Sequence, residues 1–170
     1  MATTMRLIGK VVLGSDTATI TFSDIPGSGY TDLLLSMSLR TSASGSNNDC
    51  AMKFNGSTTG RSYRSLYGTG SSTGSSNGST LLYIGPASAT TSASNTFSSF
   101  EIYIPNYAGS ANKSFSCTTA NEDNASLAYI FAIAGLWSNT DAITSIDVYS
   151  NTSANFKSGS SAFLYGITKA

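Results

Sequence analysis

The sequence predicts an all-β fold, a single-domain antiparallel β-sandwich that is jelly-roll-like and has about eight to ten strands. Apolar side chains recur at every second position rather than with a helical period. Turn residues interrupt these runs at roughly 8–15-residue spacing, which is typical of sandwiches and jelly rolls. No linker divides residues 1–170, and a chain of this length is large enough to bury a core of its own.

Four patterned strands are predicted in the first third of the chain: Met5–Leu13, Ala18–Phe22, Tyr30–Arg40 and Cys50–Phe54. The third is the clearest, because its apolar residues alternate with polar ones, with Leu34 as the exception. The apolar set is Leu33, Leu35, Met37 and Leu39. After these strands, Asn55-Gly56 has the composition of a hairpin turn, and Arg61–Tyr67 is expected to pair loosely.

The middle of the chain is almost free of large side chains. Residues 68–79 are nearly all Gly, Ser, Thr and Asn, and this composition predicts a flexible loop within the domain. A short strand is expected at Leu81–Ile84, followed by a second polar loop that reaches Asn95.

Five further strands are predicted in the second half: Thr96–Ile104, Lys113–Cys117, Leu127–Ala134, Ala142–Tyr149 and Ser161–Ile167. Leu127–Ala134 is apolar at nearly every position, which favours a central strand buried on both faces and closed by Trp137. Ala120–Ala125 is expected to form a turn. One helical turn is possible at Asn139–Ala142.

The charge pattern argues against nucleic-acid and membrane partners. The net charge is zero and the nine Lys and Arg are scattered, whereas nucleic-acid binding requires clustered cations. No apolar run approaches the roughly 20 residues of a membrane span, and the N-terminal residues lack the apolar core of a signal peptide. We therefore expect folding in a cytoplasm, where Cys50 and Cys117 are buried small residues rather than a disulfide.

The sequence contains no histidine, which removes the commonest general base and the commonest metal ligand. The glycines of residues 68–78 lack the lysine and the following helix of a phosphate-binding loop. We therefore expect a protein that is not an enzyme, with no catalytic residues, no cofactor and no metal site.

Three groups of residues offer weaker evidence for a chemical site, and each also has a simpler structural interpretation. Two carboxylates suffice for glycoside hydrolysis, but the acids are interpreted as solvated surface groups: Glu101, Glu122, Asp123, Asp141 and Asp147. Residues 121–124 offer four side-chain oxygens for calcium, yet their spacing favours a plain turn. Six tyrosines were weighed as a sugar-stacking platform and are expected mainly to pack in the core: Tyr63, Tyr67, Tyr83, Tyr103, Tyr107 and Tyr149.

Five stretches, in order along nearly the whole chain, resemble virion structural proteins of tailed phages of the cyanophage and marine phage type, which have a jelly-roll core. The stretches are Phe22–Pro26 leading into Tyr30–Arg40, Phe54–Gly56 followed by Arg61–Tyr63, Ile104–Tyr107, Trp137–Ile146 and Gly159–Ile167. The resemblance implies a virion protein assembled in the host cytoplasm, first of all a capsid decoration or cement protein. Such a protein binds the outside of the major capsid protein lattice and stabilises it. The alternative is a tail, baseplate or fibre-tip module that binds a host glycan or another tail protein.

Self-association is also expected, because a charge-poor β-rich chain exposes sheet edges that pair readily with other chains. We expect a closed homo-oligomer, a trimer. We further expect that residues 68–79, residues 88–95 or residues 1–4 become ordered only on the capsid.

Overall fold

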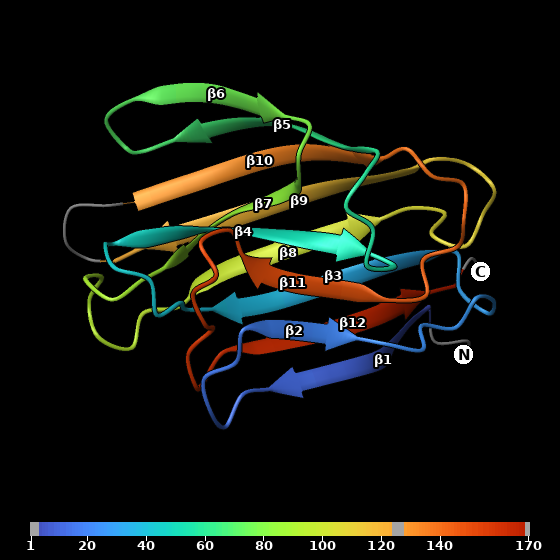
Figure 1. The fold of residues 1–170 in the computed structure, drawn as a ribbon, viewed down its shortest axis with the longest axis horizontal. Helices are drawn as coiled ribbons and strands as arrows, with labels where there is room; N and C mark the ends of the chain where they lie inside the picture. The colour runs from blue at the N-terminus through green and yellow to red at the C-terminus, as the bar shows by residue number, and fades with distance from the viewer. Residues whose placement is uncertain (1–3, 124–127, 169–170) are drawn as a thin grey trace.

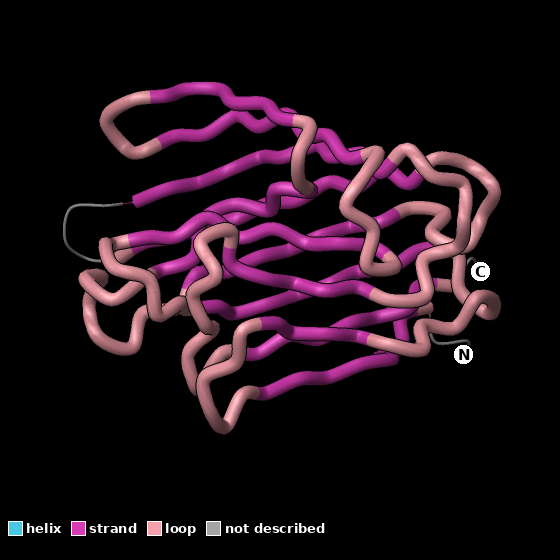
Figure 2. Tube along the Cα trace, viewed as in Figure 1, coloured by secondary structure: helices cyan, strands magenta, loops and turns pink. Residues whose placement is uncertain are grey.

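The computed structural model describes residues 4–123 and 128–168. These residues form twelve β-strands in two antiparallel sheets and no helix, as Figures 1 and 2 show. The predicted all-β sandwich is confirmed, and the number of strands exceeds the eight to ten expected. Among the described residues there is no helix long and apolar enough to cross a membrane.

The two sheets differ in size. The eight-stranded sheet has the order β1 (Met5–Val12), β12 (Ser161–Ile167), β3 (Asp32–Leu39), β8 (Ser98–Ile104), β9 (Lys113–Glu122), β10 (Ala128–Trp137), β5 (Arg61–Gly68) and β6 (Thr73–Gly78). The four-stranded sheet has the order β2 (Thr19–Phe22), β11 (Ile146–Ser150), β4 (Asn47–Phe54) and β7 (Leu82–Ser88). In Figure 1 the smaller sheet lies in front, and the β5–β6 hairpin projects beyond it.

The core lies between the sheets and follows the alternation seen in the sequence. In β3 every second residue is buried, and these are the four apolar residues of the predicted set, while Leu34 is half-buried on the other side. In β8 the side chains of Phe100, Ile102 and Ile104 are buried and Glu101 and Tyr103 point outward. Period-two patterning therefore identified which face of β3 and of β8 is inside.

The strand pairing is nested. When β5, β6, β9 and β10 are set aside, the first remaining strand pairs with the last: β1 with β12, β2 with β11, β3 with β8, and β4 with β7. All four pairs are antiparallel. This is the arrangement produced when one long two-stranded ribbon folds over on itself. The four strands set aside extend the larger sheet beyond β8.

The prediction that residues 68–79 form a flexible loop is wrong. Residues 69–72 form a tight turn in which the Thr69 N–H donates to the Ser72 carbonyl at 2.9 Å, and the chain continues as β6. Two glycines of β6 lie opposite tyrosines of β5: Gly78 opposite Tyr63 and Gly74 opposite Tyr67. Each aromatic ring covers the glycine across from it, and this packing compensates for the weak strand preference of glycine.

The prediction that Leu127–Ala134 is buried on both faces is also wrong. Phe131 and Ile133 are buried between the sheets, but Ile130 is 59% exposed, and Ala132 and Ala134 are exposed as well. The reason is that the described residues place no layer over the outer side of the larger sheet. Leu127 itself lies outside the described residues.

Three smaller expectations are corrected or refined. The turn at Ala120–Ala125 is wrong in its first part, because β9 runs through Glu122; residues 124 and 125 lie outside the described residues. The expected helical turn at Asn139–Ala142 is replaced by a turn in which the Asp141 N–H donates to Asn139 Oδ1 at 2.6 Å. The turn at Asn55-Gly56 is confirmed by its positive φ angles, but it connects two sheets rather than a hairpin.

Two cationic side chains tie the loops at the ends of the sandwich. Lys113 is fully buried, and its Nζ donates to the carbonyls of Gly109 and Ala111 at 2.6 Å each and of Thr140 at 3.1 Å. Burial lowers the pKa of Lys113. Arg40 donates in the same way to carbonyls of Ser92, Ala93 and Thr96. The polar loop around residues 89–96 is therefore held against the body of the protein.

Candidate functional site

The candidate site is the outer face, which we define as the side of the eight-stranded sheet that points away from the four-stranded sheet. In its middle, β9 and β10 present uncharged side chains that are small or apolar. They are Ser114, Ser116, Thr118, Ala120, Ile130, Ala132 and Ala134. Glu101 of β8, which is paired with Thr118, and Glu122 near the end of β9 lie on the same face beside these side chains. Depletion of charged residues is typical of the central part of protein interfaces.

An apolar patch lies on the part of the outer face nearest the β6 edge, and we define it as Leu66, Ile130, Ala132 and Ala134. Leu66 is 67% exposed and is the most exposed large apolar side chain among the described residues. Two shallow grooves of about 470 and 630 Å³ lie over the patch and share the lining residues Leu66, Ser75 and Ala132. Contiguous exposed apolar surface is one of the features by which contact sites on proteins are recognised.

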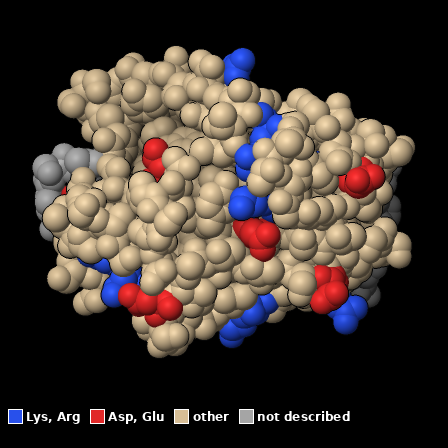
Figure 3. Space-filling view, viewed as in Figure 1, with Lys and Arg blue, Asp and Glu red and all other residues tan. Residues whose placement is uncertain are grey.

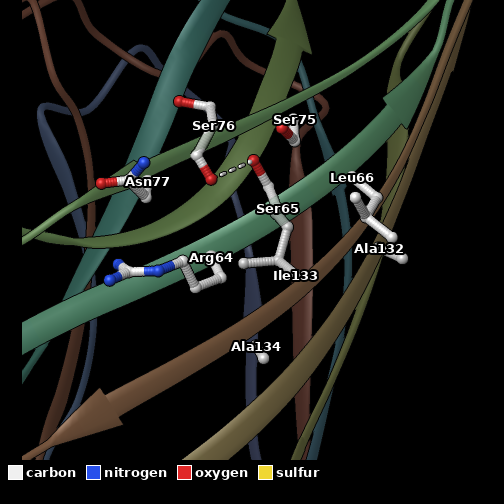
Figure 4. Close-up of a pocket in the computed structure, with 9 residues that line it drawn as sticks. All are labelled: Arg64, Ser65, Leu66, Ser75, Ser76, Asn77, Ala132, Ile133 and Ala134. Atoms are coloured by element: carbon white, nitrogen blue, oxygen red, sulfur yellow. Dashed lines mark hydrogen bonds between the residues drawn. The ribbon is translucent and has the colours of Figure 1, made fainter.

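The smaller groove has a polar rim, which Figure 4 shows in close-up. Arg64 and Asn77, which are paired across β5 and β6, border one end of it. The Ser65 hydroxyl donates to the Ser76 carbonyl at 3.4 Å and is engaged within the hairpin. The groove therefore combines an apolar floor with one cation and a few hydroxyl and amide groups at its border.

The outer face is large enough for a specific interface. Eight strands spaced about 4.8 Å apart, each about eight residues long at about 3.4 Å per residue, give a face of roughly 1,000 Å². A standard protein–protein interface buries about 800 Å² on each partner. The face therefore has the size of a specific protein–protein interface.

Charge is sparse on the opposite side of the molecule too. Figure 3 views the side that carries β4 and β11, where Lys, Arg, Asp and Glu form small separate groups on an otherwise neutral surface. An exposed ion pair joins Lys157 Nζ and Asp16 Oδ2 at 2.7 Å. The Lys157 ammonium donates to Asp16 and lowers the pKa of that carboxyl.

Four of the five candidate carboxylates lie on different segments: Glu101 on β8, Glu122 on β9, Asp147 on β11 and Asp141 in a loop. Glu101 and Glu122 both lie on the larger sheet, but four residues of β9 and one strand separate them, which places them about 14 Å apart. Asp147 lies in the other sheet, where it accepts a hydrogen bond from Thr21 at 2.7 Å, and Asp141 lies in a loop. Glycoside hydrolysis uses carboxyl groups roughly 5–10 Å apart, so none of these placements provides such a pair.

The four oxygens considered for calcium do not form one loop either. Asn121 is buried in β9 and its Oδ1 accepts a hydrogen bond from Ser88 at 3.1 Å. Asp123 is buried, so the interpretation of this carboxylate as a solvated surface group is wrong, and Asn124 lies outside the described residues. In the part of the chain that the structure describes, no three His, Cys, Asp or Glu side chains gather as metal ligands would.

Three of the six tyrosines come together with two further rings in an aromatic cluster, which we define as Tyr63, Tyr67, Tyr83, Tyr129 and Phe131. Ring centroids are 5.0 Å apart for Tyr63–Tyr83, 5.1 Å for Tyr67–Phe131, and 5.9 Å for Tyr83–Phe131 and Tyr129–Phe131. The Tyr83 hydroxyl donates to Asp49 at 3.0 Å, and burial followed by that carboxylate raises the pKa of Tyr83.

The other three tyrosines lie elsewhere. The Tyr103 hydroxyl donates to Asp32 at 2.9 Å, and this bond raises the pKa of Tyr103. Tyr107 is fully buried and donates to the Pro26 carbonyl. Tyr149 packs under the Lys53 ammonium, 4.6 Å from the ring centroid. No single platform of six tyrosines is therefore present.

Cys50 and Cys117 are buried free thiols, as the sequence predicted. Burial raises the pKa of Cys117 to about 12 and raises that of Cys50 as well. Both remain protonated at neutral pH and are poor nucleophiles.

Sequence reasoning missed the apolar patch, although a signal for it was present. In β10 large side chains alternate with small ones, so that Phe131 and Ile133 are separated by Ala132, and Ala134 follows. Alternation in size, rather than in polarity, marks a strand with one packed and one open face. Leu66 lacked this signal, because it is a large outward-facing residue and its inward-facing neighbour Ser65 is small.

The chain matches no protein-family model, no curated protein and no solved structure.

Proposed function

We propose that the protein is a bacteriophage virion structural protein, a capsid decoration or cement protein, that binds the outside of the major capsid protein lattice through its outer face. The observation that carries the proposal is this broad, charge-poor face with its apolar patch. The resemblance of the five sequence stretches supports the same class of protein.

The strand topology supports the proposal at the level of fold. We infer that the eight nested strands are a jelly-roll core, because a jelly roll contains eight strands in two sheets, and its strands pair first with last. Jelly rolls recur in viral capsid proteins. The added strands β5, β6, β9 and β10 widen one sheet and thereby create most of the docking surface.

The proposed mechanism is adhesion without turnover. A rigid sheet lying across a boundary between capsid subunits buries surface on both of them, so that separating the subunits also requires breaking the contact with the decoration protein. Weak single contacts suffice when many copies bind a repeating lattice or each copy touches several subunits. Low charge on the docking face keeps the desolvation cost of such a contact small.

The test is incorporation into particles. Ala132→Lys places a charge in the middle of the proposed contact, and Thr21→Lys places the same charge on the exposed side of the four-stranded sheet. We expect hundreds of wild-type copies per particle by quantitative mass spectrometry, and a reduction of about tenfold or more for Ala132→Lys with Thr21→Lys unchanged. A few tens of wild-type copies or fewer, or the reverse order of the two variants, contradicts the proposal.

A second candidate is the tail or fibre-tip module that binds a host glycan, and the aromatic cluster is the observation that favours it. Figure 3 shows the surface hollowed beneath the β5–β6 hairpin. Tyr63, Tyr67 and Tyr129 of the cluster are half-buried and keep part of their surface accessible. Binding on a glycan array that Tyr63→Ala abolishes and Tyr103→Ala preserves supports this function. An array without a hit contradicts it.

A further inference from the structure

The two sheets have four strand edges, and three of them are protected against pairing with another chain. β1 carries the charged residues Arg6 and Lys10 and has a bulge between Leu7 and Gly9. β2 is only four residues long. β7 contains Pro86, and all seven of its residues are buried. Charges, bulges, short length and coverage are the devices by which proteins prevent edge-to-edge association.

The fourth edge, β6, has none of these devices. It is six residues long, pairs with β5 without a register shift, and contains neither a charged residue nor proline. Its residues are exposed or half-buried, and β5 is its only partner in the sheet. Alternate backbone N–H and C=O groups of β6 therefore point away from the sheet and are available to another strand.

The charge pattern indicates which kind of strand can pair with β6. Residues 65–100 contain no Asp, Glu, Lys or Arg, so β6 itself carries no charge, although Arg64 of β5 lies opposite Asn77. A neutral, extended partner with small side chains fits best, and β6 of a second copy has that character. Antiparallel pairing of two identical edges about a twofold axis also closes the assembly, because neither copy retains a free β6.

We propose that two copies of the chain associate through β6, so that two eight-stranded sheets join into one continuous sheet. This twofold dimer replaces the trimer expected from the sequence, because two identical edges that pair with each other close the assembly at two copies. The two outer faces then lie side by side and the docking surface is doubled. Dimerisation uses the β6 edge of the sheet, whereas the proposed capsid binding uses the outer face. Either one can therefore fail without the other.

Sedimentation velocity of the purified protein at tens of micromolar tests this. We expect twice the 17.6 kDa of one chain for the wild type. Ser75→Lys lies at the middle of β6, where the two copies approach most closely, and should sediment as a monomer because like charges meet. Ser114→Lys places the same charge on β9, inside the sheet, and should leave the dimer intact.

A mixing experiment separates pairing from damage to the hairpin. Ser75→Lys and Ser75→Asp should each be monomeric alone and should form a dimer when mixed, because opposite charges then face each other across the axis. Three outcomes overturn the proposal: a monomeric or trimeric wild type, a dimer that Ser75→Lys leaves unchanged, or two charged variants that stay monomeric when mixed.

Discussion

The two edge strands of the eight-stranded sheet, β1 and β6, differ in their protection against pairing with another chain. The β1 edge carries two cations and a bulge, and its Gly9 lies against the ring of Phe22 from the smaller sheet. The β6 edge lies beyond the smaller sheet and has only uncharged small residues, held in place by tyrosine rings of β5. β1 is therefore protected against pairing with a strand of another chain, and β6 is not.

Glycine serves two purposes in this sheet. At Gly9 the absence of a side chain lets two sheets approach closely. At Gly74 and Gly78 it makes room for a ring from the neighbouring strand. The first use belongs to the packed core, and the second belongs to the β5–β6 hairpin at the end of the sheet.

The largest effect is expected from Gly9→Val at the β1 edge. A Cβ at this position would lie 2.6 Å from Cδ1 of the buried Phe22 ring, which has no room to move. We expect the free energy of unfolding to fall by about 2–3 kcal/mol, or roughly 5–10 °C in Tm. Chemical denaturation measures the change.

The matched variant is Gly74→Val at the other edge. A Cβ there would lie 2.5 Å from Cζ of Tyr67, which is the far end of a half-buried ring that can swing outward. The loss should be about 1 kcal/mol or less. An equal decrease in the free energy of unfolding for Gly9→Val and Gly74→Val would mean that both edges of the sheet are equally rigid. This result would contradict the proposed difference between the β1 and β6 edges.

Removing a ring that supports the β6 edge should have an intermediate effect. Tyr67→Ala deletes the ring that stacks on Phe131 at 5.1 Å and covers Gly74. We expect a loss of about 1–2 kcal/mol and faster amide exchange in β6 than in β1. Tyr67→Phe keeps the ring and should behave as the wild type. Slower exchange of β6 amides in Tyr67→Ala would show that the ring does not hold the edge.

The smallest effect is expected from Asp16→Asn, beyond the C-terminal end of β1. The Lys157 ammonium lowers the pKa of Asp16 from its ordinary 3.8, so the stabilisation is present above that value and is lost as the pH falls through the lowered pKa. Because the pair is exposed, we expect a small decrease in Tm at neutral pH that shrinks with added salt. Below the lowered pKa the wild type and Asp16→Asn should melt together. A difference that persists in acid would contradict this assignment.

The sequence was a reliable guide wherever side chains alternate between apolar and polar. The residues Leu33 to Leu39 and Phe100 to Ile104 were placed on the correct faces, because burial of one face is written directly into such alternation. The buried state of both cysteines was also predicted correctly.

The accessory strands were not predictable by the same rule. β6 has no apolar side chain, and what stabilises it as a strand comes from Tyr63 and Tyr67 on another strand, which composition does not reveal. β10 was expected to be buried on both sides because Ala132 and Ala134 count as apolar. Whether alanines lie in a core or on an open face depends on a layer above them, and that is a property of the assembled fold.

The most direct test of the central contrast is amide hydrogen exchange of the wild type at low and at high micromolar concentration. Protection of amides in β6 should rise with concentration, because their free N–H groups become bonded in the dimer, while protection of β1 should stay constant. Concentration-independent exchange at both edges, or a rise in β1 alone, would contradict the account.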